Sequence, residues 1–320
     1  GTDLRVWQYD PDDPQSLRTN ALESLVLDRQ DRVWVGTNGG GLLRLRSDNG
    51  GFDSFDQVSA ECGTQVWSLA TLADTVWVGS NGKGICVLAG DGSVRTIAVG
   101  DAPGQLPNGQ IYSLRADRKG RMWIGTGAGL WRWEDGRLQQ VGAGQLGELI
   151  ITRISVDRDN QLWIGSRERL WRLDSDERLS ELHGPDGQSL RSAGVLDDRN
   201  GGRWIGTATG LYRQSGHDSA MQLLHDDAGS GFLTGNSAVL DMLQDQQGGL
   251  WFATDSQGLA YLPPDWRRFS NGHQLQGRML ESISMTRSTA DGDGFLITSD
   301  DGLLRLDGQG QLQRLLTRQQ

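Results

Sequence analysis

Four carboxylates in the loops of this sequence have the chemistry of a catalytic acid and base. They are Glu148, Asp255, Asp300 and Asp301. Hydrolysis of a glycosidic bond needs two carboxylates that face each other across a cleft, so these residues would act together only if the fold brought their loops together. No local Ser-His-Asp or Cys-His signature accompanies them. We therefore predict that the protein is not an enzyme.

Three of the four histidines, His183, His225 and His273, precede segments that read as strands. Imidazoles from converging loops can bind a metal ion. These three come from different parts of the chain and show no short-range ligand spacing. The sequence therefore predicts neither a metal site nor a cofactor.

A larger set of amide, guanidinium and carboxylate side chains falls in two groups of loops that we expect on one face of the protein. Together with nearby aromatic residues, such groups suit a polar small molecule such as an oligosaccharide. A polar rim of loops is also what any soluble protein of this kind presents. The candidate binding residues are Arg18, Asn20, Asn38, Asn81, Asn108, Arg167, Arg169, Arg191, Asn236, Asp255 and Arg278.

A motif that occurs seven times supplies the elements that position these loops. Its anchors are Trp34, Trp77, Trp123, Trp163, Trp204, Trp251 and Phe295, which are 43, 46, 40, 41, 47 and 44 residues apart. This period is typical of a four-stranded propeller blade. We predict one all-β domain over residues 1–320, a seven-bladed β-propeller of four-stranded antiparallel blades. The expected blades are 20–57, 64–99, 108–142, 149–182, 189–224, 236–270 and 278–317.

Two residue types recur inside each unit and both have a structural interpretation. Aspartate lies six residues before the anchor at Asp28, Asp117, Asp157, Asp198 and Asp245. An Asp side chain accepts backbone N–H groups across a turn, so we expect these residues to hold turns. The motif tryptophans are expected to fill the space between blades. Outside the motif, we expect Trp131, Trp133, Trp171 and Trp266 to be partly exposed.

Closure of the ring has two candidates. Residues 4–9 form a good strand ahead of the first blade and would complete a last blade made from residues 279–285, 295–298 and 303–306, which leaves no exposed edge. Residues 311–317 could instead supply that outer strand. We favour closure by residues 4–9.

Composition narrows the functional classes. The net charge of −10 disfavours nucleic acid and anionic lipid as partners. No run of 18 apolar residues occurs, and no signal peptide is visible, so we expect a mature or trimmed fragment. Of the two cysteines, Cys62 precedes the predicted innermost strand of its blade and Cys86 lies on the third strand. Strands two apart are roughly 10 Å from each other. That separation is too large for a disulfide without loop movement, so we expect two buried or semi-buried thiols that do not fix the compartment.

The unit D-x-x-G-x-(L/M)-W-(I/V)-G-(T/S)-x-x-G-(L/I), and the whole segment 9–45, resemble the two-component-regulator propeller repeat. The likeness is weaker in the second unit, where Thr71 replaces the turn aspartate, in the fourth, where Arg169 takes a glycine position, and in the seventh, where Phe295 and Ile297 replace Trp and Gly. The family has no fixed catalytic residues to carry over.

The resemblance implies a periplasmic ligand-sensing module of a bacterial receptor, followed by a transmembrane helix and a cytoplasmic output domain. That domain is often a histidine kinase or a diguanylate cyclase, and a receptor of this kind would signal as a homodimer. Two other functions are open from the sequence: a protein–protein interaction scaffold, and a propeller lyase or glycoside hydrolase.

Overall fold

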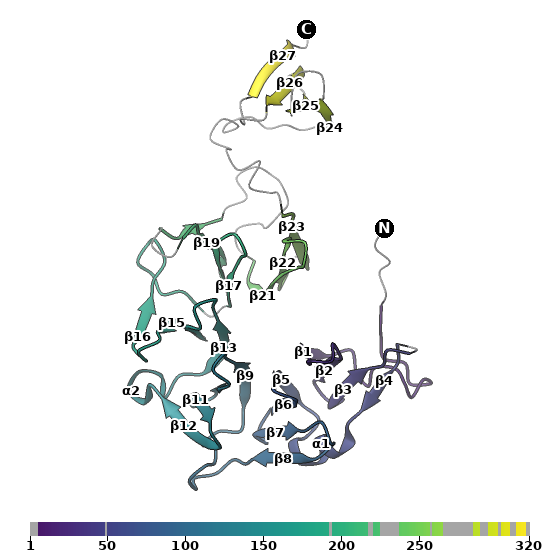
Figure 1. Ribbon diagram of the computed structural model, residues 1–320, viewed down its shortest axis with the longest axis vertical. Helices are drawn as coiled ribbons and strands as arrows, with labels where there is room; N and C mark the ends of the chain where they lie inside the picture. The colour runs from purple at the N-terminus through teal and green to yellow at the C-terminus, as the bar shows by residue number, and fades with distance from the viewer. Residues whose placement is uncertain are drawn as a thin grey trace.

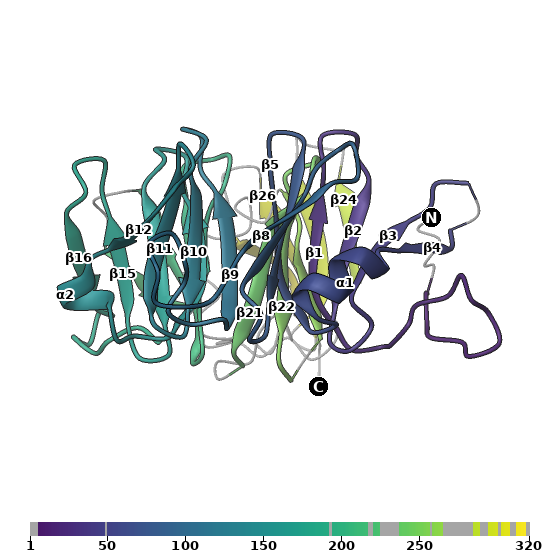
Figure 2. The same ribbon diagram turned by 90° about the horizontal axis from the view of Figure 1, so that it is seen from below.

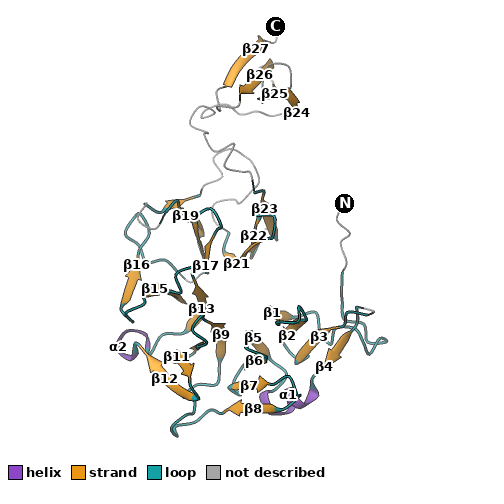
Figure 3. Cartoon of the chain, viewed as in Figure 1, coloured by secondary structure: helices purple, strands orange, loops and turns teal. Residues whose placement is uncertain are grey.

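The structure, a computed structural model, describes residues 6–48, 50–191, 194–216, 220–224, 237–256 and 258–264, and the backbone of four further strands. Figure 3 shows that strands dominate this part of the chain. Two short helices interrupt them, α1 (Asp56–Cys62) and α2 (Ala143–Leu146). The prediction of a protein built mainly from β-strands is therefore correct for the described residues.

Five successive four-stranded antiparallel sheets make up most of the molecule, each with its strands hydrogen-bonded in chain order. Their strands are β1 (Leu22–Leu27), β2 (Val33–Thr37), β3 (Leu42–Leu45), β4 (Phe52–Ser54); β5 (Val66–Leu72), β6 (Thr75–Ser80), β7 (Ile85–Leu88), β8 (Val94–Ile97); β9 (Ile111–Ala116), β10 (Met122–Thr126), β11 (Gly129–Glu134), β12 (Arg137–Val141); β13 (Ile151–Val156), β14 (Leu162–Ser166), β15 (Leu170–Leu173), β16 (Leu179–Leu182); and β17 (Val195–Asp197), β18 (Arg203–Thr207), β19 (Gly210–Gln214), β20 (Gln222–Leu223).

The sixth sheet has three described strands, β21 (Val239–Gln244), β22 (Leu250–Thr254) and β23 (Leu259–Leu262). Figure 1 shows these six sheets following one another around an arc, with the first strand of each on its inner side. In Figure 2 the strands stand side by side with their turns at the two edges. The six sheets are the blades of a propeller.

The prediction of seven blades is wrong, because the structure shows six. Strands β24 (Ser284–Ser288), β25 (Gly294–Ser299), β26 (Gly302–Asp307) and β27 (Leu312–Thr317) form a separate sheet. This sheet stands away from the six blades in Figure 1.

The glycine two residues after the motif tryptophan in the first five units gives a physical reason for this difference. A Cβ on Gly79 would lie 2.5 Å from Ile111 of the next blade, and one on Gly125 would lie 2.8 Å from the Ile151 carbonyl oxygen. Glycine at this position therefore allows the next blade to pack closely. Ala253 replaces it in the sixth unit. A further blade could not pack against this unit at the same distance.

The outer position of the last sheet is filled by β27, which pairs with β26. It corresponds to residues 311–317, the second of the two segments considered for closure. Residues 1–5 lie outside the described part of the chain, and the described residues 6–9 form no strand there, although an isolated bridge joins Tyr9 to Leu17.

The recurring aspartates hold their turns as predicted and also bind the motif tryptophans. Asp117 Oδ1 accepts the N–H groups of Lys119 and Arg121 at 2.8 and 3.1 Å, and its Oδ2 accepts the indole N–H of Trp123 at 2.9 Å. The same indole bond, 2.8–3.0 Å long, recurs in four other blades, from Trp34, Trp163, Trp204 and Trp251 to Asp28, Asp157, Asp198 and Asp245.

In the second blade, which lacks the aspartate, Thr75 Oγ1 accepts the indole N–H of Trp77 at 3.1 Å. Each of these tryptophans therefore enters the space between blades with its polar N–H satisfied.

The motif tryptophans are core residues, as predicted for this part of the repeat. Trp34, Trp77, Trp123, Trp163 and Trp204 are buried, and Trp251 is partly buried. Outside the motif, Trp131 and Trp133 are partly exposed as expected, whereas Trp171 is buried. Trp266 lies outside the described residues.

The turn aspartates should make stability fall in acid. Burial alone would raise the pKa of Asp117, but its hydrogen bonds from Trp123 and Arg121 outweigh burial and lower that pKa. A carboxyl with a lowered pKa contributes stability above its unfolded value of about 3.9, and this contribution is lost as pH falls further.

We therefore expect the urea midpoint, followed by tryptophan fluorescence, to drop below about pH 4. Asp117→Asn should cost about 1–2 kcal/mol at pH 7 and should make the midpoint less dependent on pH. An acid dependence identical to that of the wild type would contradict this role.

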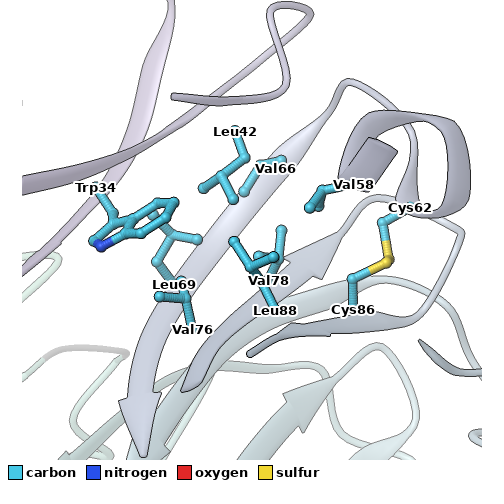
Figure 4. Packing of buried hydrophobic residues seen from close by; sticks show 10 residues of the cluster. All are labelled: Trp34, Leu42, Val58, Cys62, Val66, Leu69, Val76, Val78, Cys86 and Leu88. Carbon is cyan, nitrogen blue, oxygen red and sulfur yellow. A yellow bond between two sulfur atoms is a disulfide. The ribbon is translucent and has the colours of Figure 1, made fainter. Parts of the chain in front are cut away.

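The expectation of two separate thiols is wrong. Cys62 and Cys86 form a disulfide, with a Cα–Cα distance of 6.0 Å. The prediction placed Cys62 just before the innermost strand of its blade, but this segment forms α1, which carries Cys62 across to β7. Figure 4 shows the disulfide beside the buried cluster of Trp34, Leu42 and Val58 that connects the first two blades.

Candidate functional site

One irregularity recurs at the same place in five of the six inner strands. The pairing register with the second strand of the blade skips one residue, which marks a β-bulge. A bulge re-aims a side chain and is often found beside functional sites. The skipped residues are Glu23, Trp67, Tyr112, Thr152 and Leu240, and each of them is at least partly exposed.

Two of these residues form an aromatic pair between neighbouring blades. The rings of Trp67 on β5 and Tyr112 on β9 have centroids 5.1 Å apart and are tilted by 38°. Both side chains are partly buried. Aromatic faces that stay accessible give apolar contact area to a ligand, while the indole N–H and the phenol O–H offer hydrogen bonds.

Amide side chains join the loops around this pair. Asn81 Nδ2 donates to Gln65 Oε1 at 3.0 Å, and Gln110 Nε2 donates to Asn81 Oδ1 at 3.5 Å. Asn38 Nδ2 donates to Glu23 Oε1 at 3.1 Å. Isolated backbone bridges connect Asn38 with Gln65 and Asn81 with Gln110, so these loops run from the first blade to the third.

We call Glu23, Asn38, Gln65, Trp67, Asn81, Gln110 and Tyr112 the aromatic–amide cluster. Its amides and its carboxylate can donate and accept hydrogen bonds beside an apolar ring surface. This combination suits a polar ligand that has apolar faces.

Three of the residues singled out from the sequence lie in or beside this cluster. Asn38 and Asn81 belong to it. Asn108 accepts the backbone N–H of Gln110 at 2.8 Å, and its side chain lies against Gly127 of the same blade. The loop that enters an inner strand and the loop after the second strand therefore meet on one face.

The other candidates are not members of this cluster. Arg18 forms an ion pair with Asp56 at 2.5 Å, and Asn20 accepts the backbone N–H of Tyr9 at 2.7 Å. Arg169 pairs with Glu181 at 3.1 Å.

Three further candidates are exposed on other blades: Arg167, Arg191 and Asp255. Asn236 and Arg278 lie outside the described residues.

The carboxylates considered for catalysis are not assembled within the described chain. Glu148 and Asp255 are exposed residues of loops in different parts of the arc, and Asp300 and Asp301 lie outside the described residues. The described residues contain no group of three His, Cys, Asp or Glu side chains able to hold a metal ion. Of the three loop histidines, His225 and His273 also lie outside this part of the chain.

Sequence reasoning missed Glu23, Gln65, Trp67, Gln110 and Tyr112. One signal was present: residues 65–69 read Gln-Val-Trp-Ser-Leu and residues 110–114 read Gln-Ile-Tyr-Ser-Leu. An aromatic residue at the same position of two inner strands indicates a feature shared by neighbouring blades. The bulge that re-aims it follows from strand pairing and has no local signature.

Comparison with known protein families finds a match for two segments of the chain. The family model described as two component regulator propeller matches residues 105–128 and 233–256. These two segments therefore match the two-component-regulator propeller repeat, as the resemblance predicted. No curated protein matches the sequence.

Several solved structures share the fold. The extracellular domain of the putative hybrid two component system BT4673 from B. thetaiotaomicron is 19% identical, with a TM-score of 0.54 over 90% of this chain and 44% of that one. PorZ, a surface component of the type-IX secretion system of Porphyromonas gingivalis, is 14% identical, with a TM-score of 0.61 over 92% of this chain and 47% of that one.

Virginiamycin B lyase from Staphylococcus aureus is 14% identical, with a TM-score of 0.56 over 89% of this chain and 94% of that one. The chain thus spans less than half of the BT4673 and PorZ structures. Neither described helix is long and apolar enough to cross a membrane.

Proposed function

We propose that this chain is an extracytoplasmic ligand-sensing propeller of a bacterial signal-transduction receptor, with no catalytic activity of its own. The match of its repeats to the two component regulator propeller carries the proposal. The output domain would be a histidine kinase or a diguanylate cyclase in the same protein, which would signal as a homodimer. The shared fold with an extracellular domain of a putative hybrid two component system supports this role.

The disulfide supports placement outside the cytoplasm, in the periplasm. Disulfides persist in oxidising compartments and are rare in reducing ones. Cys62 and Cys86 are almost completely buried inside a hydrophobic cluster, where the bond acts as a structural link.

The ligand we propose is a polar small molecule such as an oligosaccharide, bound by the aromatic–amide cluster. The apolar faces of sugar rings pack on aromatic side chains, while their hydroxyls match side chains that both donate and accept, such as Asn81 and Gln110. Three blades contribute to the cluster, so a bound ligand would connect separate repeats.

The first test is whether Trp67 contributes to binding. A thermal-shift screen against oligosaccharides should show a raised midpoint with at least one compound. Trp67→Ala should weaken binding of that compound about tenfold, because a stacking contact of about 1–2 kcal/mol is lost. The measurement is the dissociation constant from isothermal titration calorimetry.

Trp7→Ala is the matched control, since Trp7 is a half-exposed tryptophan that lies outside the aromatic–amide cluster. It should bind the compound as the wild type does. Equal binding by Trp67→Ala and wild type would show that the aromatic–amide cluster does not bind this compound. Turnover of any glycan would contradict the non-catalytic role, and no binding at all would favour an interaction scaffold.

A further inference from the structure

The loop after the second strand has the same form in the first two blades. Its sequence is Asn-Gly-Gly-Gly over residues 38–41 and Asn-Gly-Lys-Gly over residues 81–84. In both loops the N–H groups of the second and fourth residues bond one carbonyl of the segment that enters the next blade, that of Thr64 or Gly109. The N···O distances are 2.8–3.3 Å. The two loops therefore differ mainly at their third residue.

This third residue is glycine in the first blade and lysine in the second. A Cβ on Gly40 would lie 2.8 Å from Thr37 Oγ1 and 2.9 Å from Arg18 Cβ, so a side chain does not fit there. Lys83 occupies the equivalent position and is exposed. The loop makes the same backbone hydrogen bonds with either residue. Its conformation therefore does not require the ammonium group of Lys83.

Lys83 lies at the edge of the aromatic–amide cluster. Asn81, two residues earlier in the same loop, donates its backbone N–H to the Gln65 carbonyl at 3.0 Å. A Cβ on Gly63 would lie 3.7 Å from Lys83 Cγ, so the aliphatic part of the lysine lies over the segment that leads into Gln65 and Trp67. The four-carbon stem of lysine is flexible. Its ammonium group can therefore turn toward a ligand bound at the cluster.

Lys83 has no ion-pair partner among the residues that the structure describes. The arginines of the first two blades all have a partner, an aspartate for five of them and the Trp133 ring for the last: Arg18, Arg29, Arg32, Arg44, Arg46 and Arg95. An unpaired ammonium group can form a charge-assisted hydrogen bond with an anion without first breaking an ion pair. Lys83 is therefore available to a ligand.

We propose that Lys83 is a specificity-determining residue that binds an anionic group, a carboxylate or a sulfate, of an oligosaccharide held by the aromatic–amide cluster. The aromatic rings and amides of the cluster would contact the sugar units, and Lys83 would select those ligands that carry a negative charge beside them. This inference rests on the proposed function and specifies its ligand as acidic.

The chain contains two lysines, Lys83 and Lys119, which allows a direct test. Lys119 is an exposed residue of the turn between β9 and β10, at the other end of the strands, and serves as the internal control. Saturating oligogalacturonate, or a chondroitin sulfate oligosaccharide, should slow acetylation of Lys83 by acetic anhydride several-fold and leave Lys119 unaffected. A neutral cello-oligosaccharide should not slow it. Mass spectrometry of the labelled peptides measures both rates.

Calorimetric titration of the whole chain with the same three probes gives a second measurement. At least one acidic probe should bind more tightly than the neutral one. Lys83→Gln should weaken this acidic binding about tenfold, because one charge-assisted hydrogen bond is lost. Lys83→Arg, which keeps the charge, should retain most of the preference, and Lys119→Gln should bind all three probes as the wild type does.

Two outcomes would overturn the inference: labelling of Lys83 that is unchanged by a bound acidic probe, or unchanged acidic binding by Lys83→Gln. Binding that depends on Trp67 would still support the aromatic–amide cluster as the sensing site in that case. Failure of all three probes to bind would count against both proposals. The acidic probe that binds more tightly identifies the preferred anionic group.

Discussion

Replacing Arg203 with methionine is expected to lower the free energy of unfolding by about 3–5 kcal/mol, the cost of breaking a buried ion pair from one side. Arg203 connects the fourth and fifth blades. Its Nη2 lies 3.0 Å from Asp157 Oδ2, and its Nε lies 2.8 Å from Asp197 Oδ1. All three side chains are less than a tenth exposed. The substitution would leave Asp157 buried without its cation and Asp197 with only the more distant Arg158, whose Nε lies 3.7 Å from Asp197 Oδ2.

Arg203 also contacts the core tryptophan of the preceding blade. Its guanidinium carbon lies 4.5 Å from the centroid of the Trp163 ring, whose indole N–H donates to the same Asp157. One cation therefore stabilises a turn, a core ring and the junction between two blades. Methionine fills a similar volume, so the loss would come mainly from the charge.

Urea denaturation followed by tryptophan fluorescence measures this effect. The matched control is Arg178→Met, because Arg178 pairs with Asp176 at 3.4 Å in a mostly exposed position. An exposed pair contributes about 0–1 kcal/mol, so the control should unfold nearly as the wild type does. A loss below about 1 kcal/mol for Arg203→Met would show that the buried pair does not stabilise this junction.

The repeat predicted the local structure of each blade well, because the same interactions act within every unit. Alternating apolar residues, the turn aspartate and the motif tryptophan together define the strands. The number of blades was not predictable from the same pattern. It depends on how closely successive sheets approach, and Ala253 changes that approach after the sixth sheet without removing its strands.

The candidate site was only partly predictable, since its geometry comes from contacts between blades. Asn38 and Asn81 were identified because they follow the second strand of their blades. Trp67 and Tyr112 were not, because a strict alternation of strand residues does not show a bulge. The ion pair between Arg153 and Asp241 joins two distant blades, and Arg153 passes beside Gly194, where a Cβ would lie 3.2 Å from its Cδ.

The disulfide is expected to contribute about 3 kcal/mol to stability. Cys62 and Cys86 are 24 residues apart, and closing a loop of this length in the unfolded chain has an effect of that size. Cys62→Ala combined with Cys86→Ala should therefore lower the urea midpoint strongly. A reducing agent should lower the wild-type midpoint in the same way and leave the double variant unchanged. Equal urea midpoints for the oxidised and the reduced wild type would contradict a stabilising role of the disulfide.

Loss of the disulfide should also affect the neighbouring structure, because the disulfide fixes α1 between the first two blades. Phe55, just before α1, packs against Trp34 with ring centroids 4.7 Å apart, and Asp56 pairs with Arg18. Loss of the disulfide should therefore loosen the junction that carries Glu23, Asn38, Gln65 and Trp67. Reduced protein, or the double variant, should bind the ligand of the aromatic–amide cluster more weakly at temperatures where it is still folded. Unchanged affinity would show that the cluster is held by the blades alone.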